Sequence, residues 1–266
     1  MAHVPSSLLT LLGLLACGSL HVDRSFVEAG RVDRIRVRWA SGEIRVRAGG
    51  SDAVRVHAEA WGPEAPIAIH HHRDAEILEI ALVCRTPVPC GGALELDVPA
   101  GVAIETDLGE GEAHLSGPLG SLSVVVGNGS IEAKGLTSQE AMLQVVRGPV
   151  EASWIRIPQR VVLASVEGNV HARVPAASYD VRWGGLEPVV LGVVVDPTVD
   201  RLIRVTTLDG EARVEGSGAV AHIRPVDPWG LVAPGRPPYG GSPCPGSSAS
   251  PLMAPPHRAR APSHAS

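Results

Sequence analysis

The sequence predicts an all-β protein, a single-domain solenoid or β-roll of short stacked strands with glycine turns. The first observation is a glycine that recurs every 18 to 20 residues, at Gly111, Gly129, Gly148 and Gly168. The second is the composition, with 44% hydrophobic but only 3% aromatic residues, which suits thin coils filled by aliphatic side chains. The third is that mostly apolar residues recur at fixed distances from these glycines, which indicates β coils that bury their inner faces on one another. These columns are Ala113, Ile131, Val150 and Val170; Thr106, Val124, Leu143 and Leu163; and Ile104, Leu122, Ala141 and Val161.

The N-terminus has the pattern of an export signal. Residues 8–16 form an apolar run that is too short to cross a bilayer, which takes roughly 20 residues, and that fits the core of a secretory signal. The segment Leu14–Cys17 resembles a bacterial lipobox, which implies lipidation of Cys17 and a lipid-anchored protein of the cell envelope. An ordinary cleaved signal and a cytosolic protein with a misassigned start are the alternatives. We expect residues 1–17 to be the signal peptide and 18–30 a linker.

A single β-solenoid is expected over residues 31–218. Ile35, Val37 and Trp39 alternate with arginines, as in a half-buried strand, and Asn128-Gly129 is typical of a tight turn. Because the open ends of a solenoid must be covered, we expect the N-terminal strands and the irregular segment 175–200 to act as caps. Trp183 lies in an apolar register and is expected to pack in the core or the cap.

Two further segments carry expectations of their own. Residues 219–266 are rich in Pro, Gly and Ser and cannot bury enough apolar area to offset the entropy of ordering, so they predict a disordered tail. Cys84 and Cys90 flank five residues that include two prolines, which suggests a local disulfide in an oxidising envelope. Two free thiols are the alternative.

One stretch allows a resemblance to be stated. Residues 94–102, followed by units such as Gly129–Ala133 that close on Gly135-Leu136, resemble the bacterial putative-adhesin domains of the toast-rack kind. The resemblance covers about residues 31–218. It implies a solenoid-like all-β domain, often on envelope lipoproteins or membrane-attached sensors. It supplies no catalytic residues, and a fold does not fix a function.

A search for catalytic and cofactor-binding motifs finds one candidate set of residues. Walker, nucleophile-elbow and H-E-x-x-H motifs are missing, so no cofactor is expected, and a net charge of −5 without a basic stripe excludes nucleic acid as a partner. The third residue after each recurring glycine would form a ladder with rungs about 4.8 Å apart, which could hold a divalent metal or be a solvated face of mixed charge. Its members are His114, Glu132, Glu151 and His171. The paired glutamates would also suit glycoside hydrolysis.

These observations favour a protein that is not an enzyme. We expect an exported envelope protein that presents its solenoid for binding, adhesion or scaffolding, and whose partner is an unknown envelope protein or polysaccharide. One alternative is an envelope-stress or signalling accessory that acts through a membrane partner. The other is a polysaccharide-active enzyme of the β-helix type.

Overall fold

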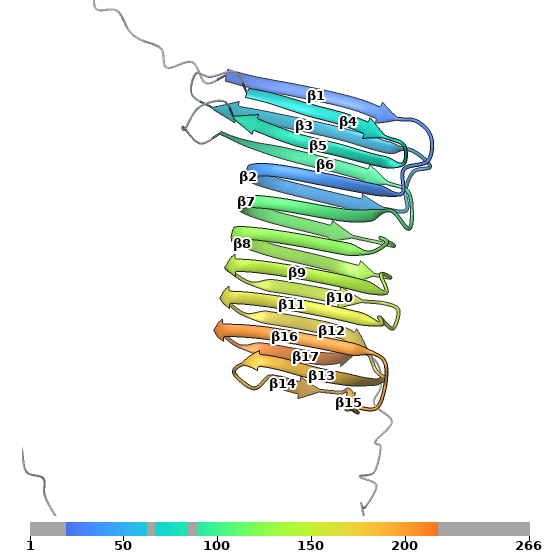
Figure 1. Cartoon of the computed structure of the whole chain (residues 1–266), viewed down its shortest axis with the longest axis vertical. Helices are drawn as coiled ribbons and strands as arrows, with labels where there is room; N and C mark the ends of the chain where they lie inside the picture. Colours follow the sequence, from blue (N-terminus) through green and yellow to red (C-terminus); the bar gives the residue numbers. More distant parts are fainter. Residues whose placement is uncertain (1–19, 63–66, 85–89, 218–266) are drawn as a thin grey trace, which may run out of the picture. The chain divides into compact units, whose positions relative to one another are not determined.

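The computed structural model describes residues 20–62, 67–84 and 90–217 as an all-β stack (Figure 1). Within these ranges there are strands and turns but no helix, so the predicted fold class is confirmed. No helix of the described chain is long and apolar enough to cross a membrane. The expected signal peptide with Cys17, and the expected tail 219–266, lie outside the described residues.

Most strands follow the predicted alternation of buried and solvent-facing residues. In chain order they are β1 Leu20–Glu28, β2 Arg34–Ala48, β3 Val54–Gly62, β4 Ile67–Asp74, β5 Ile77–Cys84, β6 Gly91–Val98, β7 Ala103–Ser116, β8 Leu122–Leu136, β9 Glu140–Arg147, β10 Val150–Trp154, β11 Arg160–Glu167, β12 Val170–Pro175, β13 Ser178–Gly185, β14 Val189–Leu191, β15 Val194–Val195, β16 Leu202–Asp209 and β17 Ala212–Ser217.

The strands wind into two layers with the core between them. The long strands β2, β7 and β8 bend at a glycine, so each runs through both layers. The first layer has the order β4-β5-β2-β7-β8-β9-β11-β16-β13-β15. The second layer has the order β1-β3-β6-β2-β7-β8-β10-β12-β17-β14. Neighbours are parallel throughout, except for the antiparallel pairs β4–β5, β1–β3 and β3–β6 at the N-terminal end.

The apolar columns predicted from the sequence stack in register. Val124 lies opposite Leu143, and Leu143 lies opposite Leu163; all three side chains are fully buried. Ile131, Val150 and Val170 form the matching column in the other layer. Burying one Val or Leu side chain fully contributes about 1.5–3 kcal/mol, so these columns supply much of the stability of the stack.

A ladder of glycines makes the bend between the layers. Its members Gly42, Gly111, Gly129, Gly148, Gly168 and Gly210 all have positive φ. A Cβ atom on any of them would lie only 1.7 to 2.3 Å from a glycine carbonyl oxygen on the neighbouring rung. Glycine is therefore required at these positions for two reasons: the positive φ angle and the close approach of the neighbouring backbone.

The order of the rungs departs from the order of the chain at both ends. Strand β2 lies between the β5/β6 rung and β7, and the β16/β17 rung lies between β11/β12 and the terminal strands β13 and β14. The segment 18–30 is not only a linker, because β1 occupies Leu20–Glu28 and pairs with β3. It packs there because Val22 and Phe26 turn toward the core.

The C-terminal end corrects a second expectation. The strands β13, β14 and β15 end the stack, in the segment 175–200 that was expected to act as a cap, so the correction concerns Trp183 alone. Trp183 is not part of the core, since it is 47% exposed. The last strand, β15, extends only along Ser178 and Tyr179 and therefore leaves Trp183 uncovered.

Cys84 and Cys90 form a disulfide with their Cα atoms 6.0 Å apart. Cys84 ends β5, and Cys90 directly precedes β6. The bond therefore ties together the two layers of one rung.

Candidate functional site

The outer face of the second layer carries a row of polar side chains on eight successive strands, from β3 to β17, which we call the charged ladder. The strand register places its members side by side, each on the strand next to that of the one before. They are His57, Glu95, Arg45, His114, Glu132, Glu151, His171 and Arg213. The four residues that the sequence marked for a metal, from His114 to His171, are thus consecutive rungs of this ladder.

The spacing of the ladder limits what those four residues can bind. Rungs lie about 4.8 Å apart, so His114 and His171 are separated by about 14 Å and cannot contact one ion together. His114 Nδ1 lies 3.2 Å from Glu132 Oε2, and Glu132 also pairs with Lys134. Only adjacent rungs could share an ion, and metal binding by this set stays a prediction.

His171 makes its charged contact with Glu215 on the neighbouring strand β17. Its Nε2 lies 3.2 Å from Glu215 Oε2, an ion-pair distance without hydrogen-bond alignment. Arg173 donates to the same carboxylate at 3.2 Å, and Arg213 lies 2.6 Å from its other oxygen. The hydrogen bond from Arg173 is the main cause that lowers the pKa of Glu215, and the nearby His171 and Arg213 lower it further. At this end of the ladder, the negative charge of Glu215 is therefore already balanced by the basic side chains around it.

The glutamate pair has the spacing of a glycosidase site, but Glu132 does not suit the role of the general acid and the depression above the pair is small. Glu132 and Glu151 are direct neighbours on adjacent parallel strands, close enough for two catalytic carboxyls. However, the hydrogen bond from Lys134, and then that from His114, lowers the pKa of Glu132, whereas a general acid needs a raised pKa. The depression above this pair has a volume of about 110 Å³, below the range of about 300–1,000 Å³ that is usual for ligand sites.

Two clusters of possible metal ligands in the described chain are centred on His114 and His57 of the charged ladder, and the sequence reasoning found neither set, although it named His114. In the first, His114 Nε2 lies 3.4 Å from Glu43 Oε1 and 3.2 Å from Glu112 Oε2. Arg45 already donates to Glu43 at 2.5 Å, so this cluster has a cation of its own. The sequence does contain a signal for this cluster, because Gly42 belongs to the same series as Gly111. Extending the series of recurring glycines to Gly42 would have placed Glu43 beside Glu112.

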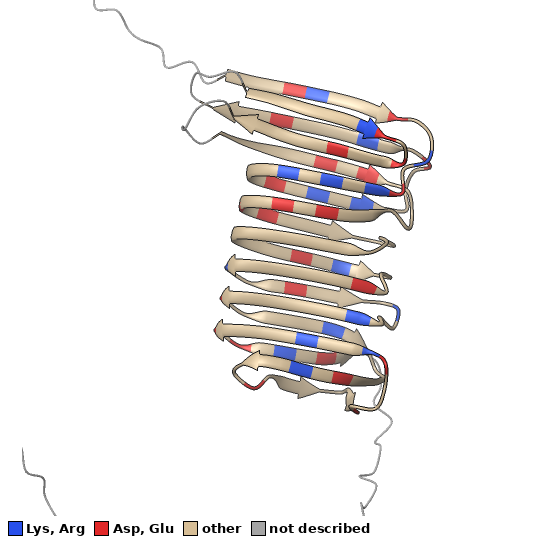
Figure 2. Cartoon of the chain, viewed as in Figure 1, with Lys and Arg blue, Asp and Glu red and all other residues tan. Residues whose placement is uncertain are grey.

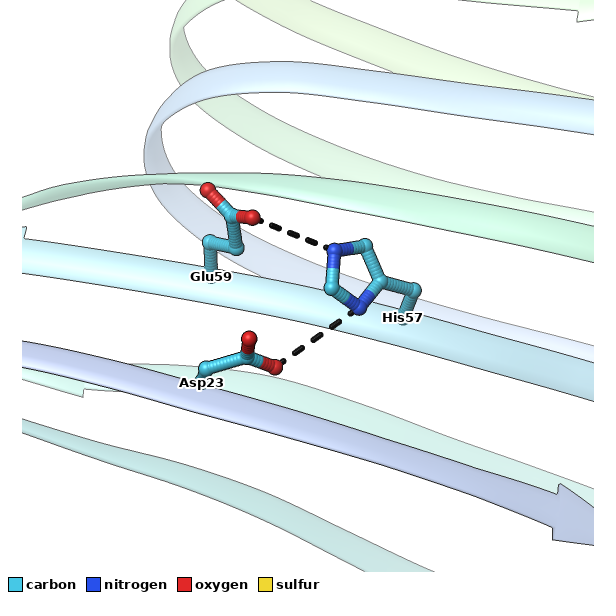
Figure 3. Close-up of side chains that lie close together, drawn as sticks. All are labelled: Asp23, His57 and Glu59. Carbon is cyan, nitrogen blue, oxygen red and sulfur yellow. Dashed lines mark hydrogen bonds and ion pairs between the residues drawn. The ribbon is translucent and has the colours of Figure 1, made fainter.

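The second cluster joins the terminal strand β1 to β3 (Figure 3). His57 Nε2 lies 3.2 Å from Glu59 Oε1, and His57 Nδ1 lies 3.7 Å from Asp23 Oδ1. The hydroxyl of Ser25 hydrogen-bonds to the same Nδ1 at 2.9 Å. No sequence signal pointed here, because β1 has no recurring glycine and its segment was assigned to a linker.

The outer face of the first layer is different in character. Its centre, on β8, β9 and β11, carries few charges (Figure 2). We call it the uncharged face, formed by Ser123, Val125, Met142, Gln144, Val162 and Ala164. An open depression of about 470 Å³ includes part of it and is bordered by Arg34, Glu105, Glu140 and Arg160.

The fold and its faces define an all-β coil stack that presents one charged face and a second face whose centre carries few charges (Figure 2). No family model matches the sequence, and no curated protein does. Solved structures named as adhesion proteins are similar. A putative cell adhesion protein from Clostridium sporogenes is 10% identical, with a TM-score of 0.38, over 73% of this chain and 100% of its own. A putative adhesin from Bacteroides fragilis is 11% identical, with a TM-score of 0.41, over 74% and 97%. Likeness at this level transfers no function.

Proposed function

We propose that this chain is an exported, non-enzymatic protein of the cell envelope whose coil stack is a platform for binding or scaffolding. The observation that carries the proposal is the in-register stack itself, which holds its outer side chains in flat, regularly spaced rows. A lipid at Cys17 would place this platform at a membrane surface. The partner is an envelope polysaccharide or protein.

The uncharged face is the surface that supports this role best. On the opposite face many charges pair within the molecule, as Arg47 does with Asp97 at 3.0 Å and Arg173 with Glu215 at 3.2 Å. A partner there would have to break such pairs. Val125 and Val162 are only partly buried, and the 38% exposed Met142 lies between their strands. A flat partner can cover these side chains without breaking an ion pair.

A co-sedimentation experiment tests the proposal. The chain with Cys17→Ala, which cannot be lipidated, is mixed with isolated cell envelopes and pelleted. We expect the protein to pellet with the envelopes, and Val162→Arg to reduce the bound fraction about tenfold, because a charge would be buried under the partner. Ser130→Arg on the opposite face, where Ser130 lies opposite Glu112, is the matched control and should bind normally. Equal binding by both variants, or no binding without the lipid, would count against the proposal.

The non-enzymatic part has its own test. Envelope polysaccharide incubated with the full chain should gain no reducing ends. Turnover that is abolished by Glu132→Gln or Glu151→Gln would overturn this part and favour the polysaccharide-active enzyme.

A further inference from the structure

We propose that Asp23, His57 and Glu59 form a binding site for a divalent transition-metal ion that fastens the terminal strand β1 to β3. One ligand atom from each residue lies within 4.8 Å of the others. Zn²⁺ bonds to imidazole nitrogen and carboxylate oxygen are about 2.0–2.2 Å long, so small side-chain rotations bring all three atoms around one ion. The proposal goes beyond the proposed function and does not depend on it.

The strand register gives the electrostatic reason for a cation here. Asp23 and Glu59 are direct partners across the antiparallel pair β1–β3. Like charges directly opposite each other destabilise a sheet. In the described chain, the ion pairs of both carboxylates are made with His57 and with no Arg or Lys. By contrast, other opposed acidic pairs have a cation beside them: Arg45 lies beside Glu43 and Glu112, and Lys134 lies beside Glu132 and Glu151.

The chemistry of the set selects the class of metal. One imidazole with two carboxylates suits zinc and related transition metals, whereas calcium and magnesium prefer oxygen alone. The two ring nitrogens face different groups, because Nδ1 meets Ser25 and Asp23 while Nε2 meets Glu59. One of these nitrogens would bind the ion, so the carboxylate that now faces the other nitrogen must rotate toward it. With Nε2 as the ligand, the Ser25 hydroxyl at Nδ1 would help to orient the ring.

A fourth group lies within reach along β1. His21 precedes Asp23 by two residues, so the alternation of the strand puts both on the same outer face, about 6.6 Å apart along the chain. His21 is exposed and is diagonal to Glu59. It is therefore the natural candidate to complete a four-ligand shell.

The consequence of metal binding concerns the attachment of β1. In the described part of the chain, β1 has a ladder partner only on one side, where it pairs with β3. An ion held by Asp23 from β1 and by His57 and Glu59 from β3 adds a cross-link between side chains. Because β1 begins at Leu20, this cross-link would secure the strand closest to the expected lipid on Cys17.

Calorimetry and hydrogen exchange test the proposal together. The full chain is stripped of metal with a chelator and titrated with ZnCl₂, and bound zinc is measured separately. We expect one Zn²⁺ per chain at this site, and amide exchange of β1 slowed about tenfold when the metal is present. Glu59→Gln and His57→Ala should each weaken zinc binding by about 10–100-fold or more. His21→Ala should weaken it less.

Matched variants on the other cluster separate the outcomes. Glu112→Gln and His114→Ala should leave this binding unchanged. Unaltered affinity in Glu59→Gln and His57→Ala, or loss of affinity in the other cluster's variants instead, would overturn the site. Ca²⁺ binding as tight as Zn²⁺ would exclude the imidazole as a ligand. Zinc bound without slower exchange in β1 would overturn the fastening role. Thermal melts of the metal-free variants, compared with metal-free wild type, show that each variant is folded.

Discussion

Replacing Gly129 by alanine should unfold the protein at a much lower temperature. Gly129 has φ of +140°, and a Cβ there would lie 1.7 Å from the carbonyl oxygen of Gly111. Real Cβ atoms essentially never approach closer than 3.0 Å, so the rung must move by about 1.3 Å. The backbone strain costs about 1–3 kcal/mol. Each ladder hydrogen bond weakened by the movement costs about 1 kcal/mol more.

The total is about 3 kcal/mol, which corresponds to a fall in Tm of roughly 6–12 °C for a domain of this size. Differential scanning calorimetry measures it against two controls. Gly101 has φ of +84° but nothing within 4 Å of its Cβ position, so Gly101→Ala should show the strain alone. Gly50 has neither feature, so Gly50→Ala should be near neutral. If Gly129→Ala lowered the stability no more than Gly101→Ala does, the argument from the close approach of neighbouring rungs would be refuted.

Three further perturbations test the core, a buried hydroxyl and the disulfide. Leu143→Ala should lower the free energy of unfolding in urea by about 2–5 kcal/mol, because Leu143 is fully buried. Met142→Ala on the outer face should lower it by under about 0.5 kcal/mol. Equal losses in the two variants would refute the strand register. Burial raises the pKa of Tyr179 from its ordinary 10.0 to about 12, so this group stabilises the fold below pH 10 and the contribution is lost as the pH rises toward 12. Tyr179→Phe should flatten that alkaline loss in pH-dependent melts, and an unchanged profile would exclude Tyr179 as its source. Cys84→Ser with Cys90→Ser should lower the free energy of unfolding by about 2 kcal/mol in oxidising buffer and have no comparable effect in reducing buffer.

The regular centre of the stack could be predicted because each of its rungs repeats the same physical requirements. A bend needs a glycine, and the inner positions on either side of it need aliphatic side chains. Gly111, Gly129 and Gly148 meet the first requirement and fix the register of everything around them. Once that register is known, the neighbours His114 and Glu132 follow, and the structure places them side by side.

The ends could not be predicted in the same way. Strand β1 has no bend glycine and pairs antiparallel, so its partner β3 shares no period with it. The insertion of β2 between the β5/β6 rung and β7 brings together residues such as Arg36 and Glu105, 69 positions apart, with no periodic signal. The cluster of Asp23, His57 and Glu59 depends on this end pairing and was missed for that reason.

Polar residues within an apolar column show where a pattern can mislead even at the regular centre. Leu108, Val126 and Val145 form one inner column, which continues into Ser165 and Thr207. An interpretation based on polarity alone would turn these two side chains toward solvent, yet both are almost fully buried.

The reason is the glycine ladder beside them. Ser165 Oγ donates to the carbonyl of Gly148 at 2.8 Å, and Thr207 Oγ1 donates to the carbonyl of Gly168 at 2.9 Å. A buried hydroxyl is stable when it has a hydrogen-bond partner, and here the backbone of the bend provides one. The same bend that demands glycine for its geometry therefore makes an inner Ser or Thr compatible with the core, which a count of apolar residues alone would score as a break in the coil.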